Sequence, residues 1–288
     1  MPKTVVDQLR ASLARFTATE RRVAHHLLAD WPMAGLHSAT DLARNTGVST
    51  PTILRLATRL GYASWPGFQK RLREELAAQL SSPLAKSTPA TATRRGRRHG
   101  SAEFADAVAR NLRETFANLP PAELEQVGLL LSDRRRRIHL VGGRFTDSLA
   151  RYLSVQLRVL RPGVAHLQDQ ESNWQDQLLD MGRRDVLVVF DIRRSQASLL
   201  RLAEAAAARG ARVVLLTDQW LSPIARVATH LLPARVVVPS VLDSTAALLA
   251  LGEALLADVV RRDWTYGRRR MRDLERLRDA RATPAPKP

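Results

Sequence analysis

Apolar residues recur at helical spacing through the first 80 positions of the chain. Two short helical patterns flank a Thr-Gly-Val turn in the stretch SATDLARNTGVSTPTILRLATRLGY, residues 38–62. The second pattern has an inner apolar stripe, made by Ile53, Leu56, Ala57 and Leu60. These patterns predict an all-α region of consecutive short helices over residues 1–80.

Start and stop signals fit this pair of helices. Ser38 stands where a helix N-cap is expected, and Gly47 suits the left-handed position that ends the helix. Ser49 is predicted to cap the next helix, and Pro51 is tolerated in its first turn. Gly61 is expected to stop that helix. The spacing is that of a helix-turn-helix whose second helix reads DNA.

The polar residues left outside the inner stripe are candidates for DNA contact. Small hydroxyl residues at a helix N-terminus let the backbone approach phosphate, and Arg55 can reach a base edge or a phosphate one turn later. The alternative is a helical hairpin whose polar face is merely solvated. The expected DNA-binding residues, placed on the outer face or at the helix starts, are Ser38, Ser49, Thr50, Thr52, Arg55 and Arg59.

The pattern changes after residue 100, where short apolar runs alternate with helical patterns. Continuous apolar runs between helices predict an α/β domain with a doubly wound parallel sheet. The long segment 243–262 is apolar nearly all round and is expected in a core or a subunit interface, with Asp243 and Ser244 as its caps. The predicted strands lie at 137–143, 163–168, 185–192, 211–218 and 230–239.

Charge divides the chain in the same places. The formal net charge is +17, yet residues 101–260 carry 19 basic and 18 acidic residues. The excess therefore lies in residues 1–100 and 261–288, which favours a nucleic-acid-binding portion joined to a neutral module over a mere bias toward arginine. We expect a DNA-binding domain at 1–80, a flexible linker at 81–100, a second domain at 101–262, and a basic helix and tail at 263–288.

Composition narrows the class further. There is no cysteine, so neither a disulfide nor a thiolate metal site is possible. No pair of histidines has metal-ligand spacing, and we expect neither a metal nor a cofactor. No apolar run reaches the roughly 20 residues of a membrane helix, and no apolar signal region is evident near the start. A cytoplasmic location without a membrane partner is expected.

Longer strings resemble a known family. FTATERRVAHHLLADWP and SATDLARNTGVSTPTILRLATRLGYASWPGFQKRLREEL resemble the N-terminal domain of RpiR-type transcriptional regulators. Residues 101–262, with LTDQWLSPIARVATHLL, resemble the sugar isomerase (SIS) domain of those regulators. The resemblance implies three partners: a double-stranded DNA operator, a small anionic sugar-derived effector such as a phosphosugar or sugar acid, and a second copy of the chain, as a homodimer or homotetramer.

The loops expected to hold the effector depart in part from the family pattern. VGGRFTDSLA, residues 141–150, retains the tight turn after the first strand, whereas FDIRRSQAS, residues 190–198, has arginines in place of the usual Ser-x-Ser-Gly-x-Thr run. The arginines act either as an anion clamp or as ion-pair partners at an interface. The expected effector-binding residues are Gly142, Gly143, Arg144, Thr146, Ser148, Arg193, Arg194 and Ser195.

Two other functions remain open at this point. An isomerase would need a general base, and Glu253 on the long apolar segment is the candidate. A DNA-binding protein whose second domain only dimerises would need no effector. We expect a ligand-responsive regulator and no enzymatic activity, because the hydroxyl-rich phosphate loop is absent.

Overall fold

The computed structural model describes residues 4–80, 100–167 and 173–282. The first of these ranges is entirely helical, as predicted. Most of the expected linker lies outside the described residues. The N-terminal helices are α1 (Val5–Ser12), a short 3-10 turn (Leu13–Arg15), α2 (Ala18–Ala29), α3 (Met33–Leu36), α4 (Ala39–Thr46), α5 (Thr50–Arg59) and α6 (Trp65–Leu80).

The signals around the turn act largely as expected. The Ser38 hydroxyl caps α4 by accepting the Asp41 N–H, and Gly47 ends α4 with a φ of 63°, in the left-handed region. Ser49 is the N-cap residue of α5, but the prediction that its side chain caps the helix is wrong. Pro51 offers no N–H, and the Thr52 N–H donates to the Ser49 carbonyl, so the hydroxyl has no backbone donor to accept.

The inner stripe of α5 forms the centre of the helical core. Ile53, Leu56 and Ala57 are completely buried, and they share one cluster with apolar residues of α1, α2, α4 and α6. Burying a leucine or isoleucine side chain contributes about 1.5–3 kcal/mol. This cluster therefore fixes the angle between α4 and α5, and it fixes which face of α5 is exposed.

The second domain is the predicted doubly wound parallel sheet. Its five strands are all parallel and lie in the order β2-β1-β3-β4-β5, so the direction of strand succession reverses between β1 and β3. The central strand β3 is buried along its whole length. The strands are β1 (Arg137–Gly142), β2 (Val164–His166), β3 (Asp185–Asp191), β4 (Arg212–Asp218) and β5 (His230–Ala234).

Helices cover both faces of this sheet. One face packs on α9, α10 and α13, and the other packs on α11 and α12. The helices and the short 3-10 turn of this domain are α8 (Gly100–Asn118), α9 (Pro121–Ser132), α10 (Asp147–Leu160), α11 (Trp174–Leu179), α12 (Ala197–Ala208), η4 (Pro223–Arg226), α13 (Ala246–Arg262) and α14 (Trp264–Ala282).

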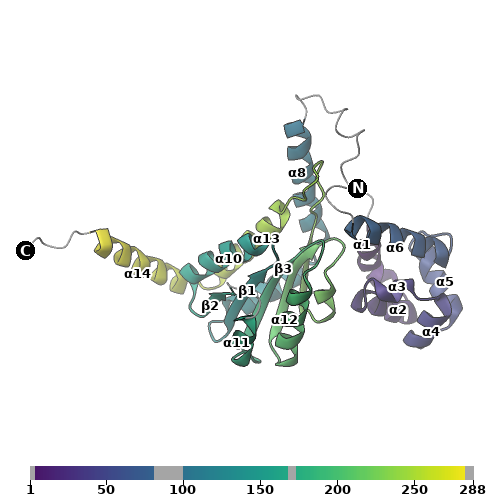
Figure 1. Cartoon of the computed structure of the whole chain (residues 1–288), viewed down its shortest axis with the longest axis horizontal. Coiled ribbons are helices and arrows are strands. Elements are labelled where there is room, and N and C mark those ends of the chain that lie inside the picture. The colour runs from purple at the N-terminus through teal and green to yellow at the C-terminus, as the bar shows by residue number, and fades with distance from the viewer. Residues whose placement is uncertain (1–3, 81–99, 168–172, 283–288) are drawn as a thin grey trace, which may run out of the picture.

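The helical domain lies to one side of the sheet domain, and α14 extends from the opposite side (Figure 1). The predicted basic helix is therefore present as α14, well away from α5 in the same chain. Among the described helices, none combines the length and the apolar character that crossing a bilayer requires.

Candidate functional site

The exposed face of α5 is the first candidate site. Arg55 is exposed, and its guanidinium donates to the Thr52 hydroxyl over 3.3 Å. Ser49, at the start of the helix, is also exposed. An N-terminal end with small side chains and one exposed arginine fits the entry of a helix into the major groove.

Three of the residues expected to bind DNA have structural roles in this domain. The outer-face placement of Thr52 is wrong: its side chain is buried, because it precedes Leu56 by one turn and so joins the inner stripe. Arg59 donates to the Glu20 carboxylate over 3.0 Å and is half exposed. The Ser38 hydroxyl donates a hydrogen bond to the Asp41 carboxylate over 2.6 Å, as part of the α4 cap.

The exposed face also holds two residues that sequence reasoning does not select. Leu54 and Thr58 are exposed, and they continue the line that starts at Thr50 with one residue per turn. An apolar residue in a helical pattern is ordinarily expected to pack in the core, so the sequence alone does not mark Leu54 as a surface residue. Its position beside Ile53, off the inner stripe, is the signal that places it outside.

The two loops expected to bind the effector meet at the carboxyl end of the sheet. Gly142 pairs with Phe190 in the β1–β3 register, so the loops that follow these strands are neighbours. This is the point where strand order reverses, the usual ligand position in open α/β sheets. Gly142 is required there, since a Cβ would lie 2.5 Å from the backbone nitrogen of Asp147.

The first loop is held from within. The Thr146 hydroxyl accepts the Gly143 N–H and donates to the Phe190 carbonyl, and the side chain is buried. Thr146 therefore ties the β1 loop to β3. Arg144 and Ser148 are the exposed polar residues of this loop, and Phe145 between them is also exposed.

The second loop turns sharply at Arg194. This residue is exposed and has a φ of 64°, an uncommon conformation for a residue with a side chain. Ser195 donates to the Asp191 carboxylate, which also accepts the Ser222 hydroxyl. Burial raises the pKa of Asp191, and these hydrogen bonds oppose the shift.

Arg193 is the most constrained residue of the candidate site. Its Nε lies 3.0 Å from the Asp243 carboxylate, and its backbone N–H donates to Asp218 over 2.6 Å. The guanidinium carbon stands 4.0 Å from the centre of the Trp220 ring. Burial raises the pKa of Asp218 to about 6. Asp243, expected to cap the long helix, instead supplies the acid that pairs with Arg193.

Comparison with known proteins agrees with this architecture. Residues 3–79 match the helix-turn-helix domain of the rpiR family, and residues 130–257 match the SIS domain. The chain belongs to the RpiR-type transcriptional regulators. In this family member, helices α4 and α5 form the helix-turn-helix pair within the first match. The loops after β1 and β3, at the switch point of the sheet, lie within the second match.

Solved structures share the fold at low identity. An RpiR transcription factor from Sphaerobacter thermophilus (sugar isomerase domain) is 23% identical over 62% of this chain and 99% of that chain, with a TM-score of 0.59. The Vibrio vulnificus NanR protein complexed with ManNAc-6P is 19% identical over 94% of this chain and 97% of that chain, with a TM-score of 0.54.

The two domains of this regulator contact one another beside the candidate effector site. The Trp31 indole donates to the Trp220 carbonyl over 3.2 Å, and the Leu221 side chain is buried within the core cluster of the helical domain. Leu221 has a φ of 60°, so the backbone turns sharply as it enters that cluster. Trp220 thus contacts both sides: its ring stacks on Arg193, and its backbone carbonyl accepts the hydrogen bond from Trp31 of the helical domain.

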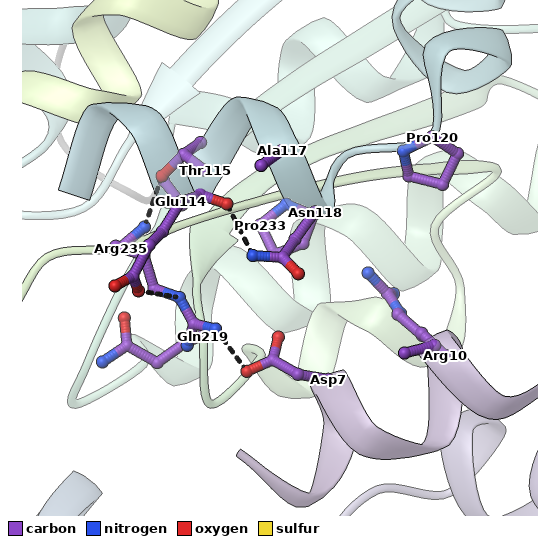
Figure 2. Close-up of a pocket in the computed structure, with 12 residues that line it drawn as sticks. Asp7, Arg10, Glu114, Thr115, Ala117, Asn118, Pro120, Gln219, Pro233 and Arg235 are labelled. Carbon is purple, nitrogen blue, oxygen red and sulfur yellow. Dashed lines mark hydrogen bonds and ion pairs between the residues drawn. The ribbon is translucent and has the colours of Figure 1, made fainter. Parts of the chain in front are cut away.

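A second contact borders a cavity between the domains. Figure 2 shows Arg235 reaching toward Asp7 of α1 on one side and Glu114 of α8 on the other. The Arg235 N–H also donates to the Thr115 hydroxyl over 2.9 Å. The cavity beside these groups has a volume of about 200 Å³. The sequence offers no signal for this ion-pair chain, because its members come from three distant segments.

Proposed function

We propose that this protein is a DNA-binding transcriptional regulator whose SIS domain senses a small anionic sugar derivative. The observation that carries the proposal is the exposed face of α5 in a family-matched helix-turn-helix domain. One side of the helix fills the core, and the other presents Thr50, Leu54 and Arg55 outward or at the helix start. Double-stranded DNA is the partner that suits this helix.

Footprinting on the DNA upstream of the protein's own gene tests this part of the proposal. We expect protection of a repeated segment, inverted or direct, at a fixed salt concentration. Arg55→Ala should lose the footprint at protein concentrations where the wild type gives full protection. The proposal would be contradicted if no segment were protected in any of a set of upstream DNA regions that includes the one before the protein's own gene.

We place the effector at the switch point between β1 and β3. Arg144, Ser148 and Arg194 supply exposed donors there, and Gly143 brings the backbone close to Asp191 and Gln196. A phosphate or carboxylate is the group that such guanidinium donors recognise. The NanR protein forms a complex with ManNAc-6P, a ligand of the class proposed here for this chain.

Arg193 gives this site a route to the DNA-binding domain. An incoming anion competes with Asp243 for its guanidinium, and Arg193 also stacks on Trp220. Movement of Trp220 acts on the Trp31 hydrogen bond and on Leu221, which lies in the helical core. Effector binding then changes the docking of the helical domain by favouring one arrangement over the other.

Isothermal titration with phosphosugars and sugar acids tests the effector site. We expect one class of ligand to bind the wild type, and we expect Arg193→Ala and Arg194→Ala to weaken it at least tenfold. Arg212→Ala is the matched control, since Arg212 is exposed at the start of β4, at the opposite end of the parallel sheet from these loops. Identical responses of the wild type and both variants, including no response, would contradict the arginine clamp for those ligands. A wild type that binds none of the ligands would favour a DNA-binding dimer that needs no ligand.

We propose that the chain associates with itself through the outer faces of α10 and α13. Tyr152 and Val155 of α10 are exposed, and the Tyr152 hydroxyl donates to Glu253 of α13 over 3.1 Å. Leu249 and Leu256 of α13 are only partly buried within the chain. Light scattering of the wild type should give a dimer or tetramer, and Val155→Asp should lower the mass toward one chain.

We propose that the protein has no isomerase activity. Glu253 is exposed and hydrogen-bonded to Tyr152, so it stands outside the switch-point loops. A general base needs a substrate proton within hydrogen-bond reach. Coupled assays on aldose phosphates should show no turnover. Turnover that disappears in Glu253→Gln would overturn this part of the proposal.

A further inference from the structure

Leu54 is the apolar residue of α5 that the fold does not use. Leu54 is 45% exposed, whereas the nearest apolar residues before and after it in the helix, Ile53 and Leu56, are fully buried. It belongs to none of the three hydrophobic clusters of the described residues. Packing therefore gives no reason for a leucine at this position.

Its neighbours define what Leu54 faces. Thr50, Leu54 and Thr58 are spaced four residues apart, so they lie in one line along the helix. The Thr58 hydroxyl donates to the Leu54 carbonyl, which commits that hydrogen to the helix itself. Arg55 stands beside the line and can supply polar contacts. Leu54 is thus an apolar position in the middle of the face that we assign to DNA.

The major groove offers one apolar group that a leucine can recognise. Base edges there present donors and acceptors, and thymine adds its 5-methyl group. We infer that Leu54 is a specificity-determining residue that contacts a thymine 5-methyl group in the operator. The inference rests on the proposed function, because it requires α5 to enter the major groove.

Replacement of thymine by deoxyuridine tests this assignment. Each thymine of the duplex protected in the footprint is replaced singly, which removes one methyl group and keeps every hydrogen-bonding group. Fluorescence anisotropy at fixed salt then gives the dissociation constants. For the wild type we expect one replacement in the contacted position to weaken binding about fourfold, the value of one buried methyl group.

The variants assign that effect to Leu54. In Leu54→Ala the same replacement should have no effect, whereas replacements elsewhere keep their wild-type effect. Leu54→Met keeps an apolar contact and should retain most of the penalty. The exposed position predicts that the melting temperature changes little in either variant.

The outcomes separate this inference from the function on which it rests. A preference for the operator over a scrambled duplex, with uracil penalties unchanged in Leu54→Ala, would overturn the Leu54 assignment alone. Equal binding of the operator and the scrambled duplex by the wild type would overturn both the proposed function and the assignment.

Discussion

The guanidinium of Arg193 lies over the ring of Trp220, with 4.0 Å between the guanidinium carbon and the ring centre. Arg193 follows β3 at the switch point, and the Trp220 carbonyl accepts the Trp31 indole of the other domain. One stacked pair thus joins the candidate effector site to the domain contact. A cation over an aromatic face contributes about 0.5–2 kcal/mol, depending on how far water is excluded.

Removing Arg193 should be costly to stability. Arg193→Ala takes away the guanidinium that faces the Asp243 carboxylate, and the two side chains are 8% and 11% exposed. We expect the free energy of unfolding to fall by about 3–5 kcal/mol, because the Asp243 carboxylate loses its ion pair in a place that water scarcely reaches. Denaturant unfolding of Arg193→Ala, Asp243→Ala and the double variant measures this. The double variant should be less destabilised than the two single effects added together, and strict additivity would show that the pair is not coupled.

Trp31→Phe should weaken communication between the domains. The substitution removes the N–H that donates to Trp220 and leaves an aromatic ring in the core. Trp65→Phe is the matched control, since its indole donates to the His37 carbonyl inside the helical domain over 3.1 Å. Both variants should lose about 1 kcal/mol of stability.

Hydrogen exchange distinguishes the two tryptophan variants. We expect faster exchange of amides in residues 218–222 for Trp31→Phe and wild-type exchange there for Trp65→Phe. The same acceleration in both variants would mean that general loosening of the helical domain, rather than the Trp31 bond, governs that loop.

Arg55 and Arg59 should have different effects although both lie on α5. Arg55→Ala should weaken binding to the operator by about 1–3 kcal/mol, with little effect on a scrambled duplex, if its guanidinium pairs with a guanine edge. Arg59→Ala should lower the free energy of unfolding by about 1 kcal/mol, because Arg59 pairs with the buried Glu20. Anisotropy and thermal unfolding of both variants test this. Equal loss of affinity for all sequences in Arg55→Ala would make Arg55 a phosphate contact.

Stability of the helical domain should depend on Glu75. Burial raises the pKa of Glu75 to about 7, although its carboxylate accepts the Val5 N–H and pairs with Arg71. The folded pKa exceeds the unfolded value of about 4.3, so the folded state holds the Glu75 proton more tightly than the unfolded state does. The stability that Glu75 contributes in this way is complete below about pH 4.3 and is lost as pH rises through about 7. Relative to Glu75→Gln, the wild type should lose about 3 kcal/mol between about pH 4 and pH 8. Parallel pH profiles for the two proteins would contradict this.

Local sequence patterns predict the helices and strands well, because burial of one helix face or of a whole strand leaves a regular pattern of apolar residues in the sequence. The stripe of α5 and the continuous apolar strands β3 and β4 follow directly from the sequence. Side-chain partners were harder to predict. Thr52 shares the inner stripe with Leu56, and Arg59 reaches a glutamate 39 positions away, which spacing within one helix does not reveal.

The contact between the domains was beyond sequence reasoning. Trp31 and Trp220 are 189 positions apart, and an indole that donates to a backbone carbonyl leaves no pattern in either segment. The same holds for Arg193 and Asp243, which meet because their loops follow β3 and precede α13 at one end of the sheet. The sequence predicts the loop that carries Arg193, but it assigns Asp243, the acid that pairs with this arginine, to a helix cap.

The most direct measurement is fluorescence-anisotropy binding of the full chain to the DNA upstream of its own gene, against a scrambled duplex of the same length and composition. Salt is held at a physiological concentration, because phosphate contacts dominate raw affinity. A sequence-specific regulator should bind the native duplex at least about a thousandfold more tightly. Equal and weak binding to both duplexes would mean that the net charge of +17 acts as a general attraction for DNA and would contradict the account.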